Sequence, residues 1–208
     1  MTTALFSSTY FPPVAWLAAA AQYSTLLIEA KETFPKQTYR NRAEIMTAGG
    51  IRPLAVPVIR NNHSRTEEVT IDYRNRWNTI HWRTITAAYS ASPYFLYYSD
   101  DLERLLNKEY NSLLELDITT TKWLLKQFKI ACTVELTTDW NPPTNDPNDY
   151  RYTFSPKHPY PTENFKPYYQ VFADRIPFTP NLSALDLLLN MGPDAKGYLP
   201  LFRVEQVS

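Results

Sequence analysis

The spacing of hydrophobic and polar positions changes several times along this chain, and each change marks a predicted element. "TALFSSTYF" (3–11) is uncharged and favours a β-strand, and Pro12 and Pro13 stand where a helix tolerates proline, at its start. "VAWLAAAAQ" (14–22) follows as a short apolar helix, and "TLLIEAK" (25–31) as a buried strand. Strand, helix and strand in this order predict a compact βαβ opening.

The next stretch has the pattern of further strands. Gly49 and Gly50 mark a turn, after which "PLAVPVI" (53–59) and "EEVTIDY" (67–73) are strand candidates. Apolar residues at every other position of the second segment have the period of a half-buried strand. Pro57 indicates an edge strand or a bulge in the first one, because proline cannot donate to a β-ladder.

Helical periods begin at Trp77. Residues 77–89 are predicted to form a helix, and 111–128 ("NSLLELDITTTKWLLKQF") have the strongest helical pattern in the chain. Between them, Ser99 with Asp100 and Asp101 suits an N-cap and an acidic first turn. One face of the first helix gathers Trp77, Ile80, His81, Thr84, Ile85 and Ala88.

The last third of the chain contains a strand, a long loop and a closing helix. "ACTVELT" (131–137) returns to a strand pattern, with Cys132 expected as a buried, inert thiol. Residues 139–167 are dense in Pro, Asn, Asp and Tyr, which is typical of a lid or a binding loop. "PNLSALDLLLNMGP" (180–193) is a helix in which Ser183 and Asp186 form a pair like a capping box. The predicted fold class is α/β or α+β, a single compact domain over 1–208 with a mixed sheet and several helices.

Composition excludes several classes of protein. At 208 residues, 44% hydrophobic and 20% charged, the chain is globular, and a net charge of zero argues against nucleic acid as a partner. A single cysteine excludes an intrachain disulfide and a cysteine-rich zinc site, and it fits a reducing compartment. No apolar run approaches the ~20 residues of a membrane-spanning helix. No metal site and no cofactor are predicted, since neither metal-ligand spacing nor a glycine-rich phosphate loop occurs.

Donors gather in one short stretch. "KQTYRNR" (36–42) contains Lys36, Arg40, Asn41 and Arg42 together with the phenol of Tyr39. Between positions 36 and 83 there are nine Lys or Arg and four acids, a local excess of 9 − 4 = 5. Arginine binds phosphate and carboxylate through two parallel hydrogen bonds, so an anionic small molecule would explain this segregation. A solvated basic face, or arginines paired with acids such as Asp100 and Asp101, would explain it equally well.

His81 is the candidate general base, because its pKa is ordinarily near neutrality. A histidine that shares a helix face with Trp77 and Ile85 is, however, more often a core residue with its hydrogen bonds satisfied. The turn at 10–14 precedes the first helix and is a second place where an anion could bind.

Four segments resemble the WbqC-like protein family. They are "TYFPPVAWLAAAAQYSTLLIEA", "YRNRAEIMTAGGIRPLAVPV", "WNTIHWRTITAAYSASPYFLYY" and "NLSALDLLLNMGPDAKGYL", in the family's order. The resemblance implies a cytoplasmic bacterial protein of surface-polysaccharide (O-antigen) synthesis, with a transferase role that adds an amino-acid or acyl group to a sugar. Many members open with His-Gln-Pro before the tyrosine, where this chain has Phe6, Ser7 and Ser8. If that histidine is a catalytic base, His81 or a hydroxyl has to replace it here.

Two functions compete at this stage. In the first, the chain is a transferase acting on a nucleotide-sugar or a similar anionic substrate. Arg40 and Arg42 hold the anion, helped by Lys36, while Tyr39 and Asn41 orient hydroxyls. Tyr10 and His81 are the catalytic candidates, and 139–167 closes as a lid. In the second, the chain is a non-catalytic binding or scaffold protein whose partner surface is the Tyr/Pro-rich loop 139–167. A weaker third reading makes 36–42 purely structural.

Overall fold

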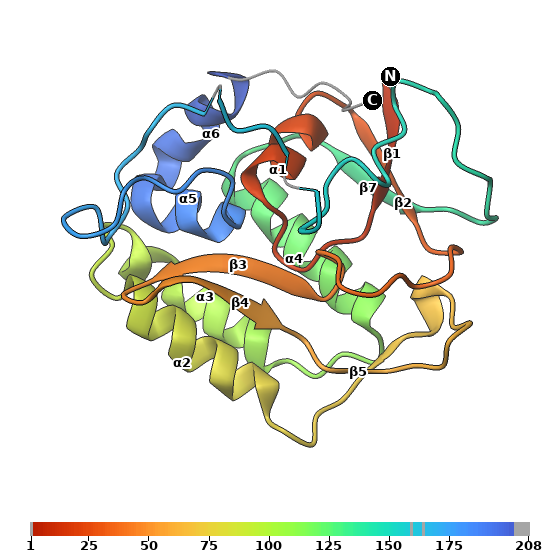
Figure 1. The fold of residues 1–208 in the computed structure, drawn as a ribbon, viewed down its shortest axis with the longest axis horizontal. Coiled ribbons are helices and arrows are strands. Elements are labelled where there is room, and N and C mark those ends of the chain that lie inside the picture. The colour runs from red at the N-terminus through yellow and green to blue at the C-terminus, as the bar shows by residue number, and fades with distance from the viewer. Residues whose placement is uncertain (1, 159, 164, 202–208) are drawn as a thin grey trace.

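The opening of the chain forms a parallel three-stranded sheet. The computed structural model describes residues 2–158, 160–163 and 165–201 (Figure 1). Strands β1 (Thr3–Ser7), β2 (Thr25–Glu29) and β7 (Thr133–Leu136) lie in the order β1-β2-β7, all parallel. Helix α1 (Val14–Ala20) connects the first two strands and is buried on all sides. The predicted βαβ opening is therefore confirmed.

Apolar side chains from alternate strand positions hold α1 against this sheet. Ala4 and Phe6 of β1, like Leu26 and Ile28 of β2, are at most 1% exposed, as the period of two requires. The Phe6 ring lies 4.9 Å from the Trp16 ring of α1, centroid to centroid. Burying these residues supplies most of the free energy that fixes the strand ends in place.

Two small antiparallel sheets follow. β3 (Arg42–Thr47) and β4 (Gly50–Ala55) form a hairpin whose turn uses Gly50 at φ +97°, a left-handed conformation that favours glycine. β5 (Val58–Ile59) pairs with β6 (Thr70–Ile71), after the 3₁₀ turn Thr66–Glu68. Pro57 separates β4 from β5, so the single strand predicted over 53–59 is divided between two sheets instead of holding Pro57 at an edge or a bulge.

Helices cover the hairpin from both sides. α2 (Trp77–Tyr89) and α3 (Phe95–Asn107) lie on one side of it in Figure 1. α4 (Leu113–Gln127) and α5 (Ala184–Met191) lie on the other. The chain continues through the turn Gly192–Asp194, α6 (Ala195–Tyr198) and the turn Leu199–Leu201. The described residues thus form a single compact α/β domain with parallel and antiparallel sheets.

Three details of the predicted helices are wrong. Ser99 is not an N-cap, because α3 already begins at Phe95, whose buried ring extends the apolar face upstream. Ile80 is 51% exposed, although Trp77, His81, Ile85 and Ala88 on the predicted face are buried. Ser183 does cap α5, accepting from the Leu185 amide, but Asp186 turns into the core and accepts from Tyr89 and Tyr168 instead.

The thiol prediction is also wrong. Cys132 is half-buried rather than buried, and Leu136 of the following strand is 47% exposed. The physical reason is the place of β7, which begins directly after Cys132, at the edge of the parallel sheet.

The segment 139–167 has no regular helix or strand among its described residues, yet it packs closely. Tyr150, Phe154 and Phe165 are buried in the core, and the segment runs beside β1, where the Tyr150 amide donates to the Leu5 carbonyl at 2.7 Å. Within the described residues, no helix combines the length and the apolar character needed to span a membrane.

Candidate functional site

Polar residues follow both β1 and β2 at the same end of the sheet. The register pairs Ser7 with Glu29, so the segments after these two residues leave the sheet side by side. Ser8, Thr9 and Glu32 lie in these segments and are at most 2% exposed. Open α/β sheets bind ligands at the carboxyl ends of their parallel strands, so this end of the sheet is the candidate ligand site.

A phenol and an imidazole meet in this region. The Tyr10 hydroxyl lies 2.9 Å from Nδ1 of His81, and both residues are at most 4% exposed. Burial lowers the pKa of His81 to about 4, an effect that a hydrogen bond to the Ala55 carbonyl partly offsets. A neutral ring that donates Nε2–H to Ala55 presents Nδ1 as the acceptor, so Tyr10 is the donor of the pair.

A carboxyl group lies in the same region without a hydrogen-bond partner. Asp117 projects from α4, is 0% exposed, and neither of its oxygens has a partner among the described residues. Burial raises its pKa well above the usual range, and the nearby Ser8 hydroxyl and the Arg40 charge offset this only in part. The hydroxyls of Ser8 and Thr9 are likewise buried and unpartnered. Buried polar groups are usually satisfied, so a group of unsatisfied ones needs a functional explanation.

Tyr10 and Asp117 influence each other. The pKa of Tyr10 is raised well above its usual value, first by burial and then by the charge of Asp117. Residues from the end of β1, from α2 and from α4 therefore meet at one closed position. We call Ser8, Thr9, Tyr10, His81 and Asp117 the buried centre. It contains an imidazole, a phenol and a buried carboxyl with a raised pKa, which are group types found in acid–base sites.

Arg40 adjoins the buried centre but is already paired. Its Nε donates to Glu32 at 2.8 Å, and both side chains are at most 4% exposed. Burial raises the pKa of Glu32, and Arg40 lowers it. The other oxygen of Glu32 accepts from the Tyr152 hydroxyl at 3.3 Å, so the long segment contacts this pair.

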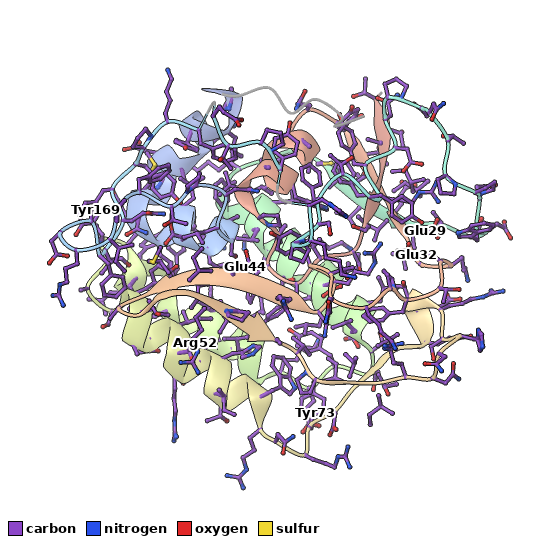
Figure 2. The ribbon with its side chains drawn as sticks, in the orientation of Figure 1. Glu29, Glu32, Glu44, Arg52, Tyr73 and Tyr169 are labelled. Atoms are coloured by element: carbon purple, nitrogen blue, oxygen red, sulfur yellow. The ribbon has the colours of Figure 1, made fainter. Side chains whose placement is uncertain are left out.

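A second buried ion pair fixes the same segment. Arg151 is 1% exposed in its side chain and donates to Glu29 at 3.0 Å and to both oxygens of Asp149. It also donates to the Asn141 and Pro142 carbonyls. Figure 2 labels Glu29, the last residue of β2, and Glu32, and the two lie close together. The segment 139–152 is thus tied by charge to the carboxyl end of the sheet.

The other residues predicted to bind substrate lie around the buried centre rather than in it. Lys36 is exposed, and Arg42 is half-buried at the start of β3. The Asn41 amide donates to the Val56 carbonyl at 3.0 Å. Burial and the Glu44 charge raise the pKa of Tyr39, while Arg42 lowers it, which places the Arg42 cation near this phenol. The structure therefore brings Tyr10, His81 and Arg40 together and leaves Lys36 and Arg42 towards solvent.

Sequence reasoning missed Asp117, Glu29, Glu32 and Arg151. A signal for the first was available, because Asp117 lies three residues after Leu114 and seven before Leu124, on the apolar face of the strongest helix. A carboxyl group on a buried helix face is rare and suggests function. The pairing of Glu29 with Arg151 could not be found, because these residues are more than a hundred positions apart in the sequence. Glu32 was missed although it lies only eight residues before its partner Arg40.

Fold and site together define an α/β protein with a buried cluster of polar residues at the carboxyl end of a parallel sheet. The sequence profile of the WbqC-like protein family matches residues 7–154. This range includes the whole buried centre and both buried ion pairs. The chain belongs to the WbqC-like family.

A curated relative gives no further function. The chain is 29% identical over 115 residues to the uncharacterised protein Rv1507c of Mycobacterium tuberculosis. The match covers 54% of this chain and 49% of the relative, about half of each. No solved structure matches the chain significantly.

Proposed function

We propose that the chain is a small-molecule transferase of surface-polysaccharide synthesis, which moves an amino-acid or acyl group onto a nucleotide-sugar or a similar anionic substrate. The observation that carries this proposal is the buried centre, in which the unpartnered carboxyl of Asp117 adjoins the Tyr10–His81 pair. Strongly shifted pKa values gather where proton transfer is carried out. The family name is associated with O-antigen synthesis, which supplies the setting.

The centre offers a division of roles. The Tyr10 hydroxyl takes a proton from the attacking amine or hydroxyl of the sugar and passes its own proton to Nδ1 of His81. As the bond from the sugar to the acyl carbon forms, the bond between that carbon and its leaving group breaks, and the proton held by His81 returns through Tyr10 to the leaving group. Asp117, held in its neutral form, donates a hydrogen bond to the acyl oxygen on which negative charge develops. This arrangement replaces the family's leading histidine, which is Phe6 here.

Anion recognition falls to the residues that face solvent. Arg42 and Lys36 bind the phosphate or carboxylate of the substrate. Arg40, neutralised by Glu32, instead holds the buried centre in position. Tyr39 and Asn41 orient this edge, the first through its main-chain carbonyl, which accepts from the Tyr10 amide at 2.9 Å.

Substrate access requires movement of the segment 139–167. Tyr10, His81 and Asp117 are at most 4% exposed, so the described conformation is closed. Tyr152 closes it by donating to Glu32, and this hydroxyl is the contact that breaks on opening. A closed site excludes water, which would otherwise hydrolyse the acyl donor in place of transfer to the sugar.

Binding and transfer test the proposal separately. UDP-glucosamine is titrated calorimetrically against the wild type, Arg42→Ala and Tyr10→Phe, and acetyl transfer from acetyl-coenzyme A is then followed by chromatography. We expect Arg42→Ala to weaken binding by about 10–100-fold, since a charge-assisted contact contributes about 1.5–3 kcal/mol. Tyr10→Phe should bind normally and transfer at least about 100-fold more slowly. A normal rate in Tyr10→Phe, or no binding of any UDP-sugar, would contradict the proposal.

A second candidate function is a non-catalytic partner-binding protein. Trp140 and Tyr152 favour it, because both are more than half exposed on the long segment. Trp140→Ala distinguishes the two functions: it should leave ligand binding and transfer unchanged in a transferase, and abolish partner capture in a scaffold.

A further inference from the structure

A groove walled by tyrosines lies at the end of the molecule where α5 is followed by α6. Its volume is about 560 Å³, within the range of small-molecule sites. Tyr94, Tyr168, Tyr169 and Tyr198 line it. Figure 2 shows Tyr169 on the opposite side of the molecule from Glu29 and Glu32. The groove is therefore separate from the buried centre.

Two of the four tyrosines, Tyr168 and Tyr198, are held in place by hydrogen bonds. The Tyr168 hydroxyl donates to the buried carboxylate of Asp186 at 2.6 Å, and its ring lies edge-on to Tyr198 at 5.1 Å. The Tyr198 hydroxyl donates to the Lys166 carbonyl. A wall fixed in this way loses little side-chain entropy when a ligand binds.

Gly192 fixes the position of the Tyr94 ring. A Cβ atom on this glycine would lie within 2.5 Å of the ring, and its φ of +56° is one that L side chains rarely adopt. Gly192 therefore both ends α5 and makes room for the Tyr94 ring.

Polar side chains also line the groove. Asn190 lines it and is 4% exposed; its Nδ2 donates to the Asp186 carbonyl at 2.7 Å, while its Oδ1 has no partner among the described residues. Asp194 adds an exposed carboxylate at the rim, at the N-cap position of α6 but without a capping bond. The Asp194 carboxylate is an exposed acceptor, so a ligand that supplies donors suits the groove.

We propose that this groove binds a saccharide, with pyranose faces stacked on Tyr94 and Tyr169 and hydroxyl groups donating to Asp194. Sugar hydroxyls provide donors along the whole ligand, whereas the C–H face of a pyranose suits the negative face of an aromatic ring. Polyproline also packs on tyrosines, but it has no N–H group to donate to the Asp194 carboxylate. The inference does not rest on the proposed transferase reaction.

Saturation-transfer difference NMR tests this directly. The probes are the methyl glycosides of glucose, galactose and N-acetylglucosamine, with hexaproline as the competing class. We expect at least one glycoside to bind the wild type, and Tyr169→Ala to weaken it about three- to tenfold through the loss of one aromatic contact. Asp194→Ala should weaken binding as well, because its carboxylate accepts a hydroxyl.

Trp140→Ala is the matched control, since Trp140 is 51% exposed against 56% for Tyr169 and lies in another segment. It should bind the glycoside as the wild type does. Near-ultraviolet circular dichroism confirms that each variant is folded. No glycoside signal, equal binding by Tyr169→Ala, or binding of hexaproline alone would overturn the proposal.

Discussion

At the residue scale, His81 links the site to pH. Its pKa is about 4 in the fold, against 6.5 when exposed, so the unfolded chain takes up the proton first as pH falls. The stability that the neutral ring provides is present above pH 6.5 and is lost as pH falls towards 4. The loss is about 3 kcal/mol by the difference in pKa.

His81→Asn separates this effect from other titrations, because it keeps an acceptor for Tyr10 and cannot titrate. Between pH 7 and 4, the free energy of unfolding in urea should fall by about 3 kcal/mol more in the wild type than in the variant, because the carboxyl groups titrate alike in both proteins. The carboxyls with lowered pKa, such as Asp72 and Asp149, act only below this window. Parallel curves for the two proteins would show that His81 is not held neutral.

Asp117 has the opposite effect on the pH dependence of stability, because its pKa is raised. Its raised pKa means that the unfolded state ionises above pH 3.8 while the fold still holds the proton, so stability is lost as pH rises. Asp117→Asn should therefore raise the melting temperature at pH 8 by several degrees, at roughly 2–4 °C per kcal/mol, and change it little at pH 4. Scanning calorimetry measures both. A lower melting temperature at pH 8 would mean that Asp117 is ionised and paired with Arg40.

At the element scale, the buried ion pair between the end of β2 and the 36–42 segment holds the site. Arg40→Met should destabilise the fold by about 3–5 kcal/mol, because it leaves Glu32 charged and buried. The Glu32→Gln/Arg40→Met double variant should recover much of that loss. Arg42→Ala is the control from the same segment and should stay within about 0.5 kcal/mol in chemical denaturation. Equal losses for Arg40 and Arg42 would refute this assignment of roles.

The long segment forms the second element-scale device. Arg151 is 2% exposed and Lys157 is exposed, so trypsin should cut after Lys157 well before Arg151. Tyr152→Phe removes the hydroxyl contact with Glu32 and should speed cleavage without lowering the melting temperature appreciably. If Tyr152→Phe is cut at the wild-type rate, this hydroxyl does not hold the segment closed.

At the scale of the whole molecule, the sequence pattern predicted those elements whose formation depends on residues near one another in the chain. The βαβ opening, the turn at Gly49 and Gly50 and the 111–128 helix all appear, because period and turn residues determine them. The exposure of Cys132 could not be read locally, since it depends on β7 lying at a sheet edge. The pairing of Arg40 with Glu32 was likewise hidden, because a cluster of donors looks the same whether its partner is a ligand or a buried acid.

The central claim is that Asp117 is a protonated carboxyl in a closed acid–base centre. A carbon-13 NMR titration of protein labelled at the aspartate carboxyl carbons measures this most directly, with the Asp117 signal assigned by its absence in Asp117→Asn. We predict a signal that moves with a midpoint well above the ordinary 3.8. A signal that moves with a midpoint near the ordinary 3.8 would contradict it.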